Sequence, residues 1–326
     1  MAEMEHLLSV LRRKAPSFVS GGEVCRELNV SRQAVWKQVR RLRRQGYVVE
    51  GRPNQGYRLV SCPDRLLPGE ISHGLGTVAL GCRIVYMERA DSTSDTAREL
   101  ARRGAREGTL VVTEEQTAGR GRRGRTWHCP FGRGLLFSLV LRPMVRPACA
   151  PQVTMVAAVA LARAVEKVTG LAPGIKWPND LLWQERKVGG ILCEMVAEAE
   201  RVAFVVLGIG LNANTPAGNF PPELAGKASS LREATGKRVD RAALARAVLE
   251  EVERAYAAFG RDGMAAVREE WLARNVTVGR RVSLATVRER LTGTAVGLGE
   301  DGQLLVETAG GIRAFAAGEV TLHGET

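Results

Sequence analysis

"QTAGRGRRGRTW", residues 116–127, places four arginines and three glycines within twelve positions of an otherwise ordinary globular sequence. Glycine permits unusual backbone angles and a close approach of a ligand, and each guanidinium group can form paired hydrogen bonds with a phosphate or a carboxylate. Trp127 offers an aromatic face on which a planar base can stack. The stretch predicts a loop that holds an anion. A flexible contact with nucleic acid stays open as the alternative, because arginine does not distinguish one phosphate carrier from another.

A second polar cluster, "GIKWPNDLLW" at residues 174–183, lies between apolar runs and is followed by "RKVGGILCE" at residues 186–194. A lysine such as Lys176 can neutralise a reacting carboxylate or phosphate, and the Asn179–Asp180 pair can position Mg²⁺ or an amine. In isolation, a turn with a local ion pair between Lys176 and Asp180 explains the cluster more simply.

The region around both clusters alternates β-rich and helical runs, which predicts a mixed α/β central domain. Helices are expected at about 94–103 and 151–169, and strands at 83–89, 109–116, 134–141, 189–196 and 202–212. The glycines at 208 and 210 do not have the spacing of a dinucleotide-binding fingerprint, and no Walker A sequence occurs in the chain.

The N-terminal segment has three short amphipathic helical runs, the last being "SRQAVWKQVRRLRRQG" at residues 31–46. Its polar face carries six Lys or Arg side chains and no acid, and two short strands around a turn follow it, which is the order of a winged helix-turn-helix. A solvated basic face, or a protein-binding module, is the alternative. The residues predicted to contact DNA are Ser31, Arg32, Gln33, Lys37, Arg40 and Arg41.

Length and composition bound the remaining possibilities. The 326 residues suggest about two domains plus a small module, and 45% apolar with 25% charged residues is typical of a globular protein. The predicted domains are residues 1–62, 63–275 and 276–326, the last a small β-barrel of SH3-like type because short strands alternate with glycine-containing turns. The net charge of +12 favours anionic partners, and +7 of it lies in residues 1–60.

Cysteine use and the N-terminus predict where the protein works. The six cysteines form no CxxC pair, which indicates a reducing compartment without disulfides. The start lacks the pattern of a signal peptide, and the most apolar stretch, Val153–Ala162, is too short to span a bilayer. We therefore expect a cytoplasmic protein without a membrane partner.

Taken together, the motifs resemble those of the biotin protein ligase family in order and spacing. They are "DSTSDTA" (91–97), "QTAGRGRRGRTW" (116–127), "KWPNDLLW" (176–183), "RKVGGILCE" (186–194), "GIGLNAN" (208–214) and "ASSL" (228–231). The basic helix followed by "PNQGYRL" (53–59) further resembles the bifunctional class, in which the ligase is also the biotin operon repressor. The resemblance covers nearly the whole chain.

The resemblance implies an activity and its partners. The family joins biotin to ATP, with Mg²⁺, to form biotinyl-5′-adenylate and pyrophosphate, and then transfers biotin to one lysine of a biotin carboxyl carrier protein. It implies a homodimer promoted by ligand that binds operator DNA, and no tightly bound prosthetic group. A DNA-binding biotin sensor that has lost catalysis and a lipoate protein ligase are the alternatives; the intact Lys176 and Asp180 argue against the sensor.

The resemblance also implies roles for individual residues, with Lys176, Asp180 and Arg122 as the catalytic set. Biotin would be contacted by Ser92, Thr93, Gln116, Gly119, Arg120, Arg122 and Lys176. The nucleotide would be contacted by Arg123, Arg125, Trp127, Asn179, Lys187 and Asn212, with Asn179 also near Mg²⁺ and residues 212–231 as a loop that orders over adenine. Ser94 departs from the pattern, since the family usually has asparagine there, and it is left out of the predicted site.

Overall fold

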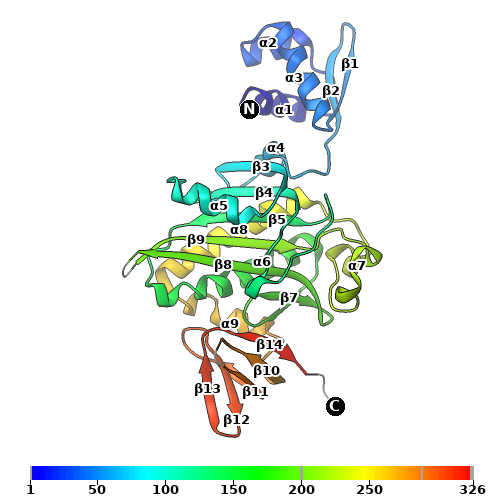
Figure 1. The fold of residues 1–326 in the computed structure, drawn as a ribbon. Coiled ribbons are helices and arrows are strands. Elements are labelled where there is room, and N and C mark those ends of the chain that lie inside the picture. Colours follow the sequence, from blue (N-terminus) through cyan, green and yellow to red (C-terminus); the bar gives the residue numbers. More distant parts are fainter. Residues whose placement is uncertain (1, 199–200, 288, 324–326) are drawn as a thin grey trace. The chain divides into compact units, whose positions relative to one another are not determined.

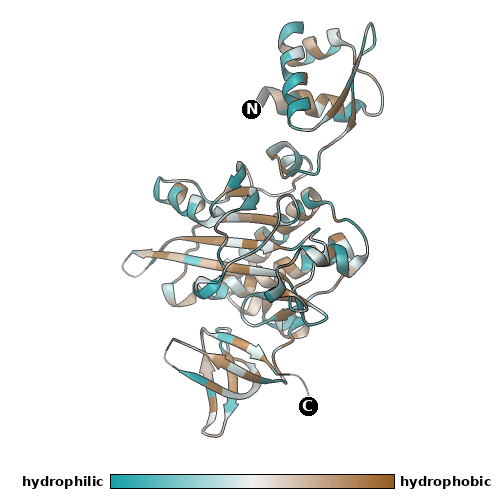
Figure 2. Ribbon diagram, turned by 45° about the vertical axis from the view of Figure 1, so that its right-hand side comes forward, coloured by the Kyte–Doolittle hydropathy of each residue, from teal (hydrophilic) through white to brown (hydrophobic). Residues whose placement is uncertain are grey.

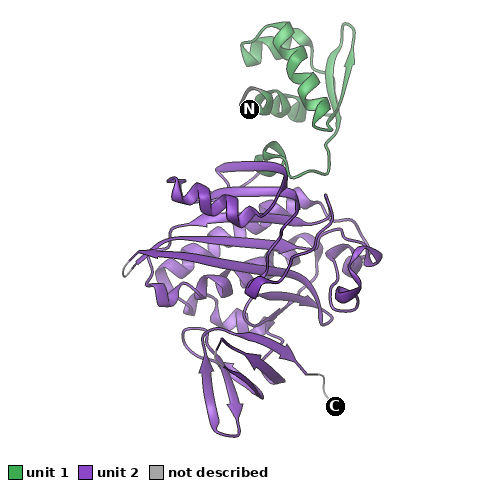
Figure 3. Cartoon of the chain, viewed as in Figure 1, with its two compact units in different colours: residues 1–73 green, residues 74–326 purple. Residues whose placement is uncertain are grey.

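The computed structural model describes residues 2–198, 201–287 and 289–323 and divides into two compact units, Met1–His73 and Gly74–Thr326 (Figure 3). The first unit extends beyond Cys62, near which the sequence predicted a boundary, because it includes the short helix α4 (Pro68–Ser72). The exact domain limits stay a prediction.

The first unit is a winged helix-turn-helix. Helices α1 (Ala2–Lys14), α2 (Gly21–Leu28) and α3 (Arg32–Arg44) precede the antiparallel hairpin of β1 (Val48–Arg52) and β2 (Gly56–Ser61). The Ser20 hydroxyl caps α2 by accepting a hydrogen bond from the Glu23 backbone N–H at 3.1 Å. The Ser31 hydroxyl caps α3 in the same way, by accepting from the Ala34 backbone N–H at 3.3 Å. The helices bury a shared apolar core that includes Leu7, Leu11, Val24, Val35 and Leu42.

Gly56 lies at the turn end of the hairpin, where β2 meets the segment before α2. Val19 and Tyr57 exchange two backbone hydrogen bonds of 2.8 Å, which attach the hairpin to the segment before α2. A Cβ atom on Gly56 would lie 1.9 Å from the Val19 carbonyl oxygen, and the φ angle of Gly56 is +101°. Glycine is therefore required here for both space and backbone conformation.

The second unit is built on a seven-stranded mixed sheet in the order β3-β4-β5-β9-β8-β7-β6 (Figure 1). The first pair is parallel and the other neighbours are antiparallel. The strands are β3 (Arg83–Ala90), β4 (Thr109–Gln116), β5 (Leu135–Leu141), β6 (Gly174–Lys176), β7 (Asp180–Trp183), β8 (Arg186–Glu198) and β9 (Arg201–Leu211). This is the mixed α/β domain that the sequence predicted, and Figure 2 shows its central strands in the hydrophobic colour.

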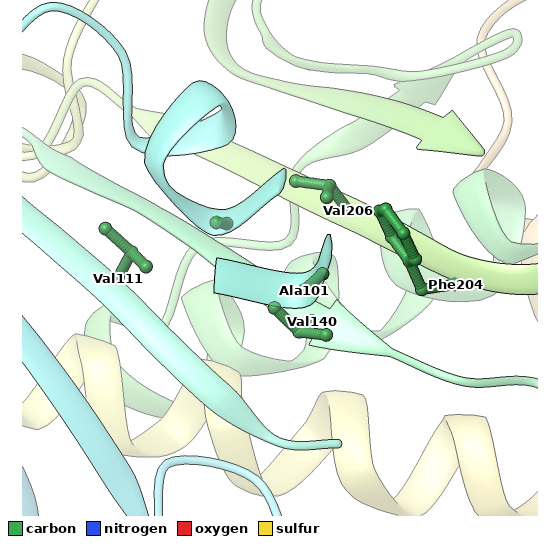
Figure 4. Close-up of a cluster of buried hydrophobic side chains, with 6 residues drawn as sticks. Ala101, Val111, Val140, Phe204 and Val206 are labelled. Carbon is green, nitrogen blue, oxygen red and sulfur yellow. The ribbon is translucent and has the colours of Figure 1, made fainter. Parts of the chain in front are cut away.

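Helix α5 (Thr93–Arg102) covers one face of this sheet. Ala97 and Ala101 on the helix pack against Val111, Val140 and Val206 on three adjacent strands (Figure 4). Small helical side chains against β-branched strand residues bring α5 close to the sheet. The N-terminus of α5 is thereby held above β4, β5 and β9, where the polar motifs of the sequence converge.

Helices α6 (Gln152–Thr169), α8 (Arg241–Asp262) and α9 (Ala265–Arg274) pack together and cover other parts of the sheet. The helical segment Pro147–Thr169 is long and apolar enough, by length and composition, to cross a membrane. It is longer than Val153–Ala162, the apolar stretch that the sequence predicts to be too short to span a bilayer. However, 78% of its most apolar window is buried inside the protein, which identifies α6 as a core helix.

The C-terminal part is a five-stranded antiparallel sheet in the order β13-β12-β11-β10-β14. Its strands are β10 (Arg281–Ala285), β11 (Arg290–Leu298), β12 (Leu304–Thr308), β13 (Gly311–Phe315) and β14 (Glu319–Leu322). The Trp177 indole N–H donates to the Gly302 carbonyl at 3.1 Å, so a buried side chain of the central motif is anchored in this part. The small β domain expected at the C-terminus is thus joined to the site region.

Candidate functional site

The arginine-rich stretch forms a tight loop that is closed by hydrogen bonds between its own backbone groups. Trp127 donates its backbone N–H to the Gly119 carbonyl at 2.8 Å, and Gly121 donates to Arg125 at 2.7 Å. Arg123 has a φ angle of 57°, a left-handed conformation that turns the chain at the tip of the loop. The backbone therefore presents the four guanidinium groups in different directions.

Each arginine of this loop has a distinct set of partners. Arg120 is ion-paired with Asp95 on α5. Arg122 donates to the Asn179 side-chain oxygen and to the Gly318 carbonyl, both at 3.2 Å. The other two reach the C-terminal sheet: Arg123 donates to the carbonyls of Ala285 and Thr286 at 3.1 and 2.9 Å, and Arg125 pairs with Glu319.

The Lys176–Asp180 motif is a hairpin between β6 and β7, with these two residues as cross-strand partners. Asn179 lies in the turn of this hairpin. Its side-chain amide donates to the Ile191 carbonyl at 2.9 Å, which fixes the amide so that its oxygen faces Arg122. Asp180 does not pair with Lys176: the Lys187 ammonium lies 2.7 Å from its Oδ1 atom. The local Lys176–Asp180 pair of the simpler interpretation is absent from the described ion pairs.

Burial alters the proton affinity of two cations here. Burial lowers the pKa of Lys176, an effect that Asp180 opposes and that Lys187 and Arg125 reinforce. Burial also lowers the pKa of Arg122, against the attraction of Asp180. A partly desolvated cation interacts more strongly with an incoming anion than an exposed one does, because water screens it less.

A small polar cavity lies between the start of α5, the end of β4 and the strands β8 and β9. Its free volume is about 50 Å³ as the side chains stand. Eight predicted site residues line it: Ser92, Thr93, Gln116, Arg120, Arg122, Trp127, Asn179 and Lys187. Gly119 is not among the lining residues; the Cβ that it lacks would lie 2.8 Å from the Trp127 carbonyl, so the structure gives it a packing role.

A larger cavity of about 560 Å³ adjoins the first one. Its lining contains nine predicted residues: Arg122, Arg123, Arg125, Trp127, Lys176, Asn179, Asp180, Lys187 and Asn212. Lys227 and Arg280 add two more cations to this lining. Since Arg122, Trp127, Asn179 and Lys187 line both cavities, a ligand in the small cavity meets a ligand in the large one at these four side chains.

The Trp127 ring packs against β8 and β9 at a position where each strand has a glycine and therefore no side chain. Gly190 on β8 and Gly210 on β9 are register partners, and a Cβ on either would approach the indole ring to 3.2 or 2.7 Å. The Lys187 ammonium lies 5.4 Å from the ring centroid, a cation–π contact. The indole Nε1 atom is buried and has no hydrogen-bond partner among the described residues, so a donor remains for a ligand.

Asn212 closes the base of the segment that the sequence predicted as a loop over adenine. Its side-chain amide donates to the Ser229 carbonyl at 3.0 Å, and its backbone carbonyl accepts from Leu231 at 2.8 Å. The Lys187 backbone N–H donates to the Lys227 carbonyl, and the Lys187 carbonyl accepts from the Ser229 N–H, so the pairing of β8 continues onto this loop. The Asn212 Oδ1 atom is buried without a hydrogen-bond donor among the described residues.

The donor set does not fit a resident metal ion. No group of three or more His, Cys, Asp or Glu side chains in the described ranges could hold one. The Asn179 oxygen, predicted to lie near Mg²⁺, accepts from Arg122, and Asp180 is paired with Lys187. The surroundings instead fit a Mg²⁺ that arrives on the phosphates of a nucleotide, the usual mode for this ion.

Sequence reasoning missed the neutral floor of the small cavity. Ser94, omitted because of its departure from the family pattern, lines this cavity, as do Phe137, Gly190, Gly208 and Gly210. The glycine signal was present in "KVGGI" and "GIGLN", but only the pairing of β8 with β9 brings those glycines opposite the loop. The contacts of Arg122 and Arg123 with the C-terminal sheet had no local signal, since they join residues about 160 to 200 positions apart.

The first unit carries a separate candidate nucleic-acid interface. The six residues predicted to contact DNA are exposed on α3 and at its cap: Ser31, Arg32, Gln33, Lys37, Arg40 and Arg41. Trp36 on the same helix is 49% exposed, and the Arg40 guanidinium lies 4.6 Å from its ring centroid. This helix therefore offers cations and one aromatic surface outward.

Comparisons with known proteins agree along the whole chain. Residues 3–58 match an HTH domain family, residues 86–212 the biotin/lipoate A/B protein ligase family, and residues 277–322 the biotin protein ligase C-terminal domain. The chain is 39% identical to the bifunctional ligase/repressor BirA of Bacillus subtilis, over 97% of both chains. It is 31% identical to BirA of Escherichia coli, over 94% of this chain and 93% of the other.

A solved structure gives the same result for the second unit. The biotin protein ligase from Aquifex aeolicus in complex with biotin and ATP is 30% identical, with a TM-score of 0.65 over 75% of this chain and all of that one. The extent of these similarities and the three domain matches leave one conclusion: the chain belongs to the family of bifunctional biotin protein ligases and repressors.

Proposed function

We propose that the second unit joins biotin to AMP from ATP and then transfers biotin to a lysine of a biotin carboxyl carrier protein, while the first unit binds operator DNA. One observation carries the assignment of the site: the two adjoining cavities share Arg122, Trp127, Asn179 and Lys187. Biotin occupies the small cavity and the phosphates of ATP the large one. The carboxylate and the α-phosphate then meet beside these shared side chains.

In the first step a carboxylate oxygen of biotin attacks the α-phosphorus, and pyrophosphate leaves. Lys176 and Arg122, both partly desolvated, offset the repulsion between the two anions. Arg123 and Arg125 stabilise the departing phosphates after exchanging their present acceptors in the C-terminal sheet for phosphate oxygens. As the counter-ion of the nucleotide phosphates, Mg²⁺ would supply further neutralisation of their charge beside these cations.

Adenine recognition uses one unsatisfied polar atom of the large cavity. The buried Oδ1 atom of Asn212 needs a donor, and the exocyclic amine of adenine supplies one. Trp127 covers the adenylate with its ring, and residues 212–231 close over the base. This arrangement keeps water away from a reactive mixed anhydride.

In the second step the carrier lysine, as a free amine, attacks the acyl carbon of the adenylate; an amide bond forms and AMP leaves. Asp180 accepts a hydrogen bond from the attacking amine and takes up its proton, which requires the Lys187 ammonium to turn from Asp180 toward the phosphate. Lys187 lines both cavities and can therefore reach either partner.

Formation of an acyl-adenylate tests the ligase activity. The protein is incubated with ATP labelled at the α-phosphate, Mg²⁺ and either biotin, lipoate or no acid, and an apo carrier domain is then added. We expect adenylate with biotin alone and its consumption by the carrier. Tight biotin binding without adenylate would instead indicate a sensor, and adenylate with lipoate would indicate a lipoate ligase.

The repressor activity requires two copies of α3 on one two-fold operator. We propose that the bound adenylate promotes a homodimer and that the protein works in the cytoplasm, where ATP and DNA are both available. Sedimentation of the protein with and without biotin and ATP, together with footprinting on its own promoter regions, tests this part. A monomer at all ligand concentrations, or no protected DNA, would contradict it.

A further inference from the structure

Four polar side chains form a continuous hydrogen-bonded chain at the small cavity, which three of them line. The Thr93 hydroxyl lies 3.1 Å from Gln116 Oε1 and 2.8 Å from the Ser138 hydroxyl. The Ser94 hydroxyl lies 3.0 Å from the same Ser138 oxygen. The chain therefore runs from Ser94 on α5, through Ser138 on β5 and Thr93 on α5, to Gln116 at the end of β4.

The direction of every proton in this chain follows from one backbone contact. The Thr93 backbone N–H donates to the Gln116 side chain at 2.8 Å, so the accepting atom is the amide oxygen and not the NH₂ group. The Thr93 hydroxyl then donates its single proton to the same oxygen. Ser138 must donate to Thr93, and Ser94 must donate to Ser138, because each hydroxyl has only one proton.

The surroundings hold Ser94 in this arrangement. Ser94 is 5% exposed and Ser138 is 0% exposed, so water has little access to either hydroxyl. Gly208 on β9 is the register partner of Ser138, and a Cβ on Gly208 would lie 2.7 Å from the Ser94 oxygen. The space that Gly208 leaves is the space in which the Ser94 hydroxyl sits.

The polarised chain presents a defined pattern to the cavity. The hydroxyl oxygens keep lone pairs as acceptors, and the Gln116 NH₂ group, turned away from Thr93, offers donors. A cyclic urea has one carbonyl acceptor with one N–H donor on each side of it. These three groups complement the pattern of the cavity. A dithiolane ring, as in lipoate, has no N–H donor and leaves the acceptors unpaired.

We propose that Ser94 is a positioning residue for the cyclic urea of biotin: its proton, given to Ser138, completes the polarised chain and leaves the Ser94 oxygen as an acceptor toward the cavity. The inference rests on the assignment of the small cavity to biotin. Without the Ser94 hydroxyl, the Ser138 oxygen loses its donor and the cavity loses one acceptor for the urea. Asparagine at this position also carries a donor group and satisfies the same requirement.

The test compares Ser94→Ala with Ser94→Asn in steady-state adenylate formation, varying biotin and ATP separately. In Ser94→Ala we expect the KM for biotin to rise about tenfold, the ordinary effect of losing one hydrogen bond in a buried network. The KM for ATP and kcat stay within about twofold, since Ser94 does not line the large cavity. Ser94→Asn keeps the biotin KM within about threefold of the parent.

An analogue sharpens the test. Biotin methylated on one ureido nitrogen lacks one donor, so the parent protein should discriminate strongly against it. In Ser94→Ala this discrimination decreases, because the acceptor that the analogue would leave unpaired is already absent. Ser138→Ala breaks the same chain from β5 and provides a second variant with the same expected increase in the biotin KM.

Thr109→Ala is the matched control. The Thr109 hydroxyl is also buried and donates to the Arg106 carbonyl at 2.8 Å, but it does not line either cavity. Equal changes in Ser94→Ala and Thr109→Ala, in thermal stability and in the biotin KM, would reduce Ser94 to a structural role and overturn the proposal. So would equal rises in the biotin and ATP KM values. A parent protein that makes no biotinyl-adenylate would refute the proposed function itself.

Discussion

The two basic regions of the molecule, α3 in the first unit and the arginine loop in the second, have similar charge and opposite organisation. On α3, no ion pair of Arg32, Lys37, Arg40 or Arg41 occurs among the described residues. In the loop, all four arginines have acceptors, either carboxylates or carbonyls. Exposed cations suit a long polyanion, whereas anchored cations suit one phosphate group in one position.

The comparison predicts its largest effect at the anchored site. Lys176→Gln removes a half-buried charge and leaves a polar side chain one atom shorter, so kcat/KM for biotinyl-adenylate formation should fall about 10²- to 10³-fold. Single-turnover formation of labelled adenylate measures this. A decrease of less than about fivefold would show that Lys176 does not act on the developing charge. Lys167→Gln, a change in an exposed lysine paired with Glu250, is the control.

Arg122→Gly should weaken retention of the intermediate more than its formation. Arg122 donates to Asn179 and Gly318 and lines both cavities, so its loss removes a lid over the adenylate. We expect dissociation of biotinyl-adenylate to accelerate about 30-fold, with less selective labelling of proteins added to the mixture. A chase with unlabelled adenylate gives the rate. Unchanged retention and unchanged carrier selectivity would contradict the role.

For the solvated region the expected effect is smaller and depends on salt. Arg40→Ala should weaken operator binding about tenfold and reduce the slope of log affinity against log salt by about one, while the ligase activity stays constant. Fluorescence anisotropy over a series of salt concentrations measures both quantities. If the affinity falls without a change of slope, Arg40 contributes through its contact with Trp36 and not through a phosphate.

The smallest effect concerns pH. Because burial lowers the pKa of Lys176, its ammonium is lost at a lower pH than that of an exposed lysine. Adenylate formation needs the charged form, so it should decline as pH rises through this lowered pKa and be fully supported below it. Lys176→Arg, which stays protonated, should lack that decline whatever its maximal rate. Parallel pH profiles of the two proteins would contradict the assignment.

Local patterns predicted the elements that carry the chemistry. The helix expected at 94–103 is Thr93–Arg102, and the strand at 109–116 has these same limits, because apolar periodicity acts within one segment. Ser94 shows what such patterns cannot provide. Its role depends on Ser138 and Gly208, and sheet pairing and the packing of α5, not neighbouring sequence, bring these residues to it.

The C-terminal sheet provides a second example. Nothing near Arg123 indicates that its guanidinium binds the carbonyls of Ala285 and Thr286, and the sequence supported a structural module there equally well. Long-range hydrogen bonds between separate folding elements leave no periodic trace in either partner.

These carbonyl contacts also make the two ends of the chain unequal as parts for engineering and evolution. The first 73 residues form a compact unit of their own, so a gene can gain or lose them without opening the ligase core. A gene shortened at its other end, before residue 277, would lose the acceptors of Arg123 and Arg125 and the carbonyl that binds the Trp177 indole. The regulatory part is thus detachable, whereas the small terminal sheet is part of the enzyme.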